Sequence, residues 1–179
     1  MTNLEKNWFV LFTRPGFEKR VSNLLGRKNI VNYCPIKRQR NAKKKGTIEV
    51  LFSSFVFVKI EETEMASIRL IDNVVNFVYW LGKPAKISQE EIEIMSRFIN
   101  EYANLRLEKI PLVQQSIIME RATNIKTKTH LVTVKNNIVK ITLPSLGYMI
   151  VAEIENSSLE VINSVKQQVT IIGKYQFAI

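Results

Sequence analysis

The spacing of hydrophobic residues at the start of the chain predicts a strand followed by an amphipathic helix. Residues 8–13 (WFVLFT) are an aromatic and β-branched run, which is typical of a buried strand. Pro15 suits the first turn of a helix, which we expect over residues 16–28. Its apolar stripe consists of Phe17, Val21, Leu24 and Leu25. The stripe predicts that Phe17 is buried and that the charged residues of this helix face solvent.

The same patterning continues to about residue 102 and predicts a mixed fold. Further strands are expected over residues 31–36, 55–60 and 74–81, and further helices over residues 64–71 and 88–102. Residues 47–52 are interpreted as the other arm of a hairpin with residues 31–36 and are not counted as a separate strand. Ser88 and Glu91 have the spacing of a capping box, which marks the start of the last helix. The order β-α-β-β-α-β-α indicates an α+β sandwich, in which helices pack on one sheet.

The pattern changes after this helix. Residues 103–116 have no clear period, and short strands then recur over residues 117–119, 131–134, 138–143, 148–154 and 159–162. Short strands at this spacing are typical of a small β-barrel. The sequence therefore predicts an α/β domain over residues 5–102, a linker over 103–116, a barrel over 117–163 and a carboxy-terminal tail over 164–179.

Composition narrows the function classes. Of the 179 residues, 46% are hydrophobic and 23% are charged, which is typical of a globular protein. No apolar run approaches the roughly 20 residues of a membrane helix, and the apolar stretch near the amino terminus is too short for a signal peptide. We therefore expect a cytoplasmic protein without a membrane partner. One cysteine, Cys34, and one histidine, His130, are too few for a disulfide or a Cys/His zinc site. The six glycines fit no phosphate-binding loop, and we expect no enzyme activity, no cofactor and no metal.

Positive charge is concentrated in the first third of the chain. Residues 1–50 hold 12 Lys and Arg against 3 Asp and Glu, whereas residues 51–104 hold 5 against 8. This asymmetry predicts one surface for a polyanion, for which nucleic acid is the usual candidate. The densest cluster consists of Lys37, Arg38, Arg40, Lys43, Lys44 and Lys45. A solvated loop between two strands explains this cluster equally well.

Three segments, in matching order and at similar spacing, resemble the amino-terminal domain of the NusG family. Residues 8–21 (WFVLFTRPGFEKRV) resemble its opening pattern, W-Y-V-[LV]-x-[TC]-x-x-x-x-E-x-x-[VA]. Residues 51–58 (LFSSFVFV) resemble L-F-P-G-Y-[VL]-F-V, and residues 74–88 resemble the strand that precedes a proline and the last helix. The likeness is closest to the specialised UpxY-like and RfaH-like paralogues. It implies a mainly antiparallel sheet in the first domain and a divergent KOW-like barrel in the second.

Two departures from the family pattern are visible. The family's Pro-Gly-Tyr is here Ser53, Ser54 and Phe55, which keeps an aromatic ring but lacks the tight Pro-Gly turn. The Gly-rich loop of the KOW barrel corresponds to residues 120–130 (ERATNIKTKTH), which contain no glycine. We therefore carry over no partner for the second domain, and ribosome, Rho and other partners stay open.

The resemblance implies a bacterial transcription elongation or antitermination factor that performs no chemistry. Such a factor docks on the clamp helices of RNA polymerase and suppresses pausing or termination, here at particular operons. The docking residues that the resemblance implies are Phe12, Phe55, Phe57, Phe77 and Trp80. Without the resemblance, these aromatic residues are expected in the core, and Trp8 is expected there in either case. We expect the protein to act as a monomer.

The resemblance also implies contact with the non-template DNA strand in the transcription bubble. The candidates on and before the first helix are Arg14, Lys19, Arg20 and Arg27, and the cluster of residues 37–45 extends them toward duplex DNA or RNA. Phosphate contacts supply affinity that falls with salt, whereas base contacts are needed for sequence choice. Residues 64–66 (EMA) stand where some relatives touch the opposite polymerase pincer, but they lack the family's small hydroxyl residues.

Two other function classes stay open. A general RNA-binding module acting in translation also explains a basic domain followed by a small barrel. It predicts tight binding to free RNA and no contact with polymerase. An enzyme with an unfamiliar Lys or Glu centre would require a pocket that holds a carboxylate or lysine of perturbed pKa.

Overall fold

The computed structural model describes residues 5–38, 48–80, 82–102, 104–110, 132–135 and 138–153. The chain divides into two compact units, Met1–Asn104 and Leu105–Ile179. Several expected features lie outside the described residues, namely the strands over 117–119 and 159–162, the glycine-free loop with His130, and the tail over 164–179.

The first unit is built on one antiparallel sheet. Its elements are β1 (Asn7–Thr13), α1 (Glu18–Arg27), β2 (Asn32–Tyr33), β3 (Ile36–Arg38), β4 (Ile48–Val50), β5 (Phe55–Ile60), the 3₁₀ turn η1 (Glu62–Glu64), α2 (Met65–Arg69), β6 (Val74–Phe77), β7 (Tyr79–Trp80), β8 (Lys83–Pro84), β9 (Lys86–Ile87) and α3 (Gln89–Glu101). The strand order is β2-β5-β1-β6, and β9 also pairs with β1. Every pairing in this sheet is antiparallel, which confirms the expected α+β arrangement.

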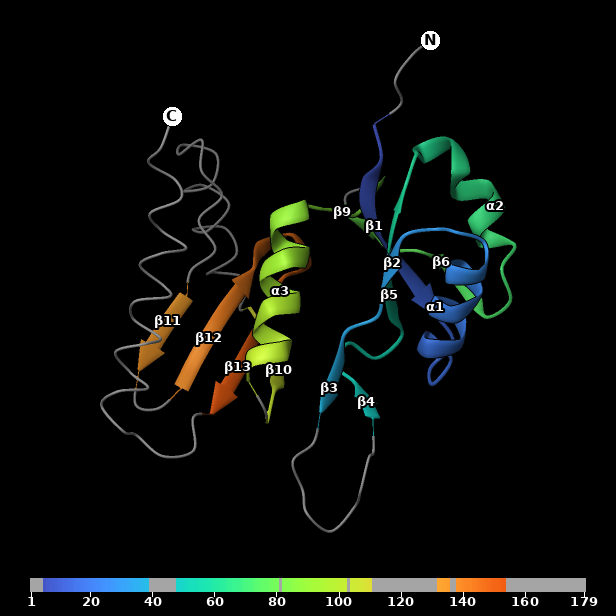
Figure 1. Cartoon of the computed structure of the whole chain (residues 1–179). Coiled ribbons are helices and arrows are strands. Elements are labelled where there is room, and N and C mark those ends of the chain that lie inside the picture. Colours follow the sequence, from blue (N-terminus) through green and yellow to red (C-terminus); the bar gives the residue numbers. More distant parts are fainter. Residues whose placement is uncertain are drawn as a thin grey trace. The chain divides into compact units, whose positions relative to one another are not determined.

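Helices cover the two faces of this sheet (Figure 1), with α1 and α2 on one side and α3 on the other. Alternate residues of a strand point to opposite faces. Phe9 and Leu11 of β1 therefore share a face with Val56 and Val58 of β5, and this face forms a buried cluster with α1 and α2. On the other face, the Trp8 indole Nε1 donates to Gln89 Oε1 of α3 at 2.7 Å. Trp8 lies in the core, as the sequence predicts.

The structure corrects three details of the sequence prediction in the first unit. The single strand expected over residues 31–36 is divided into β2 and β3 around Pro35, which has no N–H to donate to a strand ladder. The strand expected over 74–81 is likewise divided into β6 and β7. Phe17 is 36% exposed rather than buried, because it is the N-cap residue of α1 and precedes the first helical turn.

The last helix of the unit begins where the sequence predicts. Ser88 caps α3 by accepting from the Glu91 backbone N–H, and the Glu91 side chain accepts in return from the Ser88 backbone N–H. The expected capping box is therefore confirmed.

The second unit contains a four-stranded antiparallel sheet in the order β10-β13-β12-β11. Its strands are β10 (Arg106–Lys109), β11 (Val132–Lys135), β12 (Ile138–Leu143) and β13 (Tyr148–Glu153), and a 3₁₀ turn η2 (Pro144–Leu146) joins the last two. Strand β10 lies within the range expected to be a linker. Its RLEK sequence has no strong apolar pattern, and it pairs with β13, some 40 residues further along the chain.

Candidate functional site

The face of the first sheet opposite α1 and α2 changes from buried to exposed along β1. Val10 is fully buried and its strand partner Phe57 is fully buried, whereas Phe12 is 40% exposed. Phe55, the partner of Phe12, is half-buried. The apolar layer on this face therefore reaches solvent at the carboxyl end of β1.

Phe12 and Phe55 form an aromatic pair at this exposed end. Their ring centroids lie 6.3 Å apart with an interplanar angle of 68°, which is an edge-to-face contact. Aromatic rings favour this geometry, so each ring restricts the orientation of the other. The two rings of the aromatic pair therefore hold each other in one arrangement in the free protein.

Phe57 lies on the same face of the sheet as the aromatic pair, but it is buried. It packs edge-on against Phe52 with centroids 5.8 Å apart, and it also contacts Tyr33 at 6.4 Å. Burial raises the pKa of Tyr33, whose side chain also has a hydrogen bond with Ser96 of α3 that lowers it. Phe57 lies on the expected face, but it is a buried neighbour of the surface rather than part of it.

The two other expected docking residues, Phe77 and Trp80, differ in burial. Phe77 is buried on the α2 side of the sheet, where it packs edge-on against Phe9 at 6.2 Å and lies 5.8 Å from the Arg69 guanidinium. Trp80, on the β7–β8 hairpin, is 57% exposed. Of the five expected aromatic residues, Phe12, Phe55 and Trp80 therefore reach the surface, and Phe57 and Phe77 do not.

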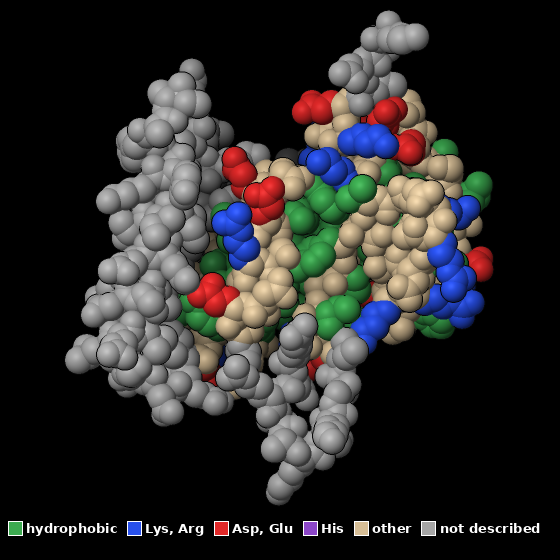
Figure 2. Space-filling view, in the orientation of Figure 1, with side chains coloured by type: hydrophobic (Ala, Val, Ile, Leu, Met, Phe, Trp, Pro, Cys, Tyr) green, Lys and Arg blue, Asp and Glu red, His purple; other side chains and the backbone are tan. Residues whose placement is uncertain are grey.

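The expected nucleic-acid residues lie on or beside α1. Arg14 is exposed in the loop before the helix, Arg20 and Arg27 are exposed on it, and Lys19 is half-buried. Figure 2 shows Lys and Arg side chains on the side of the first unit that holds α1. These cations are close in sequence to Phe12, because Arg14 follows it by two residues.

The densest basic cluster is described only in part. Lys37 lies on β3 and forms an ion pair with Glu49 of β4 at 2.9 Å. Arg38 ends β3, and Arg40, Lys43, Lys44 and Lys45 lie outside the described residues. At Lys37, therefore, part of the positive charge is already balanced within the hairpin.

Glu18, the acidic residue of the first motif, has a structural role that the sequence does not indicate. Its side chain is 3% exposed, and its Oε1 accepts from the Ser54 backbone N–H at 2.7 Å and from the Gly16 backbone N–H at 3.2 Å. One carboxylate therefore joins the loop before α1 to the turn before β5. The acidic position in the family pattern was the available signal, but its partner lies 36 residues away.

The turn at Ser53 and Ser54 corrects an expectation. The Phe55 N–H donates to the Phe52 carbonyl at 3.2 Å, and Ser54 at the third position of this turn has a φ of 65°. A positive φ at this position is the mark of a type II turn, where glycine is usual. The tight turn is therefore kept although the Pro-Gly pair is absent.

Residues 64–66 and Cys34 are placed by local contacts and by burial. The Glu64 side chain accepts from the Glu61 backbone N–H at 2.9 Å, Met65 is buried, and Ala66 is exposed. Burial and, to a lesser extent, the Glu18 carboxylate raise the pKa of the Cys34 thiol to about 11. Within the described ranges, no group of three or more His, Cys, Asp or Glu side chains could hold a metal ion. None of the described helices has the length and apolar character to cross a membrane.

The first unit combines a mixed α/β fold with exposed aromatic rings and with cations on and beside α1. Exposed rings and cations of these kinds occur at surfaces that bind other macromolecules.

The sequence pattern of the family described as transcription termination factor NusG matches residues 6–96, which is just over half of the chain. The chain belongs to the NusG family, whose members are non-enzymatic transcription factors, and membership implies an interaction with RNA polymerase. A solved structure of NusG from Thermotoga maritima, titled for its domain interaction, aligns with 84% of this chain and 98% of its own at 16% identity and a TM-score of 0.45. No curated protein matches the sequence. The family assignment rests on the sequence match.

Proposed function

We propose that this protein is a transcription elongation or antitermination factor that docks on the clamp helices of RNA polymerase through the aromatic pair and Trp80. The exposure of Phe12 carries this proposal. Residues 8–11 of the same strand are at most 7% exposed, whereas Phe12 is 40% exposed. Aromatic side chains of this kind supply much of the binding energy in protein interfaces.

The order of the aromatic pair also favours docking. Phe55 contacts Phe12 ring to ring, and the buried Phe57 fills the same face one pair further along the two strands. A surface that is already ordered loses less conformational entropy when a partner covers it. The clamp helices would therefore meet a prepared apolar surface.

Arg14, Lys19, Arg20 and Arg27 would then contact the non-template strand of the transcription bubble. They lie on or just before α1, which follows the exposed end of β1 directly. Their contacts with phosphates would add affinity that falls with ionic strength. The basic cluster of residues 37–45 would add a contact with upstream duplex DNA or RNA.

We further propose an operon-specific factor of the UpxY-like or RfaH-like type, acting in the cytoplasm as a monomer. The three motifs in the first 100 residues, and the likeness of residues 138–154 to the later barrel strands of UpxY-like members, support this finer assignment. For the second domain we propose a divergent KOW-like barrel over residues 117–163, joined by a linker. The four-stranded sheet supports a β domain, and β10 extends it ahead of the expected boundary.

The test is binding to a stalled bacterial elongation complex, measured by co-migration on a native gel. We expect the Phe12→Ala/Phe55→Ala double variant to bind at least about tenfold more weakly than wild type, because truncation of interface anchors typically has this effect. The matched control is Leu70→Ala/Val75→Ala, which removes two apolar side chains that are 85% and 53% exposed elsewhere on the unit. The control variant is expected to bind as wild type does.

Two outcomes would contradict the proposal. Equal binding by the aromatic variant and the control would remove the aromatic pair from the interface. Failure of the wild-type protein to bind complexes on several templates, together with tight binding to free RNA, would favour the RNA-binding module acting in translation.

A further inference from the structure

Glu18 occupies an unusual position for a charged side chain. It is 3% exposed in the first turn of α1, and the fixed partners of its Oε1 are two backbone amides from separate loops. Hydrogen bonds to an ionised carboxylate are stronger than those between neutral groups. A buried amide that loses its acceptor is correspondingly unfavourable.

Of the two amides that Glu18 accepts from, the Ser54 amide belongs to a residue with a strained backbone. Ser54 has a φ of 65°, a left-handed conformation that a side chain with a Cβ disfavours and that glycine adopts freely. Its N–H is bound by Glu18 at 2.7 Å, and its carbonyl accepts from the Thr13 N–H at 2.8 Å. Both peptide groups that flank this strained residue are therefore held by neighbouring segments.

The two residues of the aromatic pair are the chain neighbours of Thr13 and Ser54, which are joined by this hydrogen bond. Phe12 precedes Thr13, and Phe55 follows Ser54, so a change in the turn moves both ends of the pair. Gly16, the other partner of Glu18, lies in the loop that carries Arg14. The carboxylate thus links the turn, the aromatic pair and the loop before α1.

We propose that Glu18 is a positioning residue, whose buried carboxylate holds the Ser53–Ser54 turn left-handed and thereby sets the geometry of the aromatic pair. This inference rests on the proposed docking function where it concerns polymerase. Its structural part concerns the free protein alone. In a chain with glycine at position 54, the turn would need the carboxylate less.

The first test is the ring contact in the free protein, measured as aromatic nuclear Overhauser effects between Phe12 and Phe55 by NMR. We expect Glu18→Ala to lose this contact and to lose hydrogen-exchange protection at the Ser54 amide. We expect Glu18→Ala/Ser54→Gly to recover the ring contact, because glycine adopts the left-handed turn without help. Glu18→Gln, which keeps an acceptor oxygen, is expected to retain the contact in part.

The second test is binding to the stalled elongation complex. We expect Glu18→Ala to bind at least about fivefold more weakly than wild type, and the double variant with Ser54→Gly to recover to within about twofold. Ile68→Ala is the matched stability control. This residue of α2 is 1% exposed and lies in the buried cluster on the face of the sheet opposite the aromatic pair. At equal loss of thermal stability, Ile68→Ala is expected to bind more tightly than Glu18→Ala.

The outcomes separate the two proposals. Retention of the ring contact in folded Glu18→Ala would overturn the positioning role whatever polymerase does. Loss of the contact with unchanged binding would uphold the positioning role in the free protein and overturn its part in docking, because the geometry of the pair would then not matter for binding. If wild type fails to bind the elongation complex, the docking function fails, and the NMR experiment still decides whether Glu18 sets the aromatic pair.

Discussion

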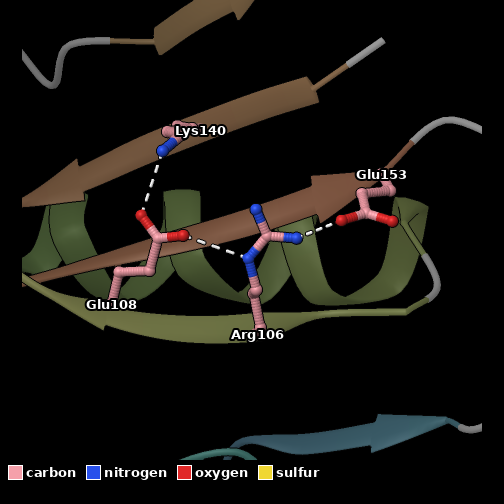
Figure 3. Close-up of polar contacts among 4 residues, drawn as sticks. All are labelled: Arg106, Glu108, Lys140 and Glu153. Carbon is pink, nitrogen blue, oxygen red and sulfur yellow. Dashed lines mark hydrogen bonds and ion pairs between the residues drawn. The ribbon is translucent and has the colours of Figure 1, made fainter.

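The sheets of the two units present different chemistry to solvent. In the first unit, β1 is buried on both faces over residues 8–11, and the ring of Phe12 near its carboxyl end is exposed. In the second unit, one face is apolar and buried, and the other carries ion pairs (Figure 3). Glu108 accepts from Arg106 and from Lys140, at 3.0 Å each, and Arg106 also pairs with Glu153.

The difference bears on the proposed docking surface. The charged face of the second sheet satisfies its own groups within the chain and is compatible with water as it stands. The exposed rings of Phe12 and Phe55 contact each other, and covering them would remove apolar surface from water, which is favourable. The ionisable groups follow the same division, because burial raises the pKa of Tyr33 and Cys34, whereas hydrogen-bonded partners raise that of Arg106 and lower that of Glu108.

The largest expected effect is a loss of stability caused by a substitution in the core of the first sheet. Phe9→Ala should lower the free energy of unfolding by about 3–5 kcal/mol, because it leaves a cavity in the buried cluster. Phe12→Ala, three residues further along the same strand, should cost less than about 1.5 kcal/mol, because that ring is 40% exposed. Urea denaturation followed by circular dichroism measures both. Equal losses for the two variants would contradict the assignment of Phe12 to the surface.

An intermediate effect concerns the thiol at the edge of the first sheet. Because burial raises the pKa of Cys34 from 9.0 to about 11, its thiolate fraction near pH 8 should be about 100-fold below that of a free thiol. A colorimetric thiol reagent should therefore react slowly with the native protein and rapidly with the same protein in urea. Similar rates in the two states would show that Cys34 is not desolvated in the fold.

The smallest expected effect concerns the ion pairs of the second sheet. Lys140 and Arg106 hold the pKa of Glu108 below its usual value, so the ionised form favours the folded state. This contribution is complete above the unfolded-state pKa of about 4.3 and is lost as pH falls through the lower folded-state pKa. Glu108→Gln should change stability by no more than about 0.5 kcal/mol near pH 7, and less at high salt. Thermal denaturation at two salt concentrations measures this, and a larger, salt-independent loss would contradict it.

Much of the first fold could be predicted because its signals are local. Strand β5 and the capping box at Ser88 and Glu91 are found where the sequence places them, since apolar runs and cap spacing depend on neighbouring residues. Both ends of β12 also coincide with the prediction, because apolar and polar residues alternate over residues 139–143.

The parts that could not be predicted depend on distant partners. Phe55, Phe57 and Phe77 look alike in sequence, and only the packing of helices on both faces of the sheet decides which ring is exposed. Glu18 acts on a residue 36 positions away, and no local pattern indicates that pairing. The left-handed backbone conformation of Ser54 could not be predicted either, because a serine does not indicate a turn that usually requires glycine.

The two tryptophans give the protein an optical reporter of its own. Trp8 is 7% exposed and its indole N–H is bound by Gln89, whereas Trp80 is 57% exposed. The two indoles should therefore emit at different wavelengths, with a blue-shifted component shielded from iodide and a red-shifted component open to quenching. A ligand that covers the β7–β8 hairpin would change only the second component, so unlabelled protein can report contact at Trp80 by its intrinsic fluorescence.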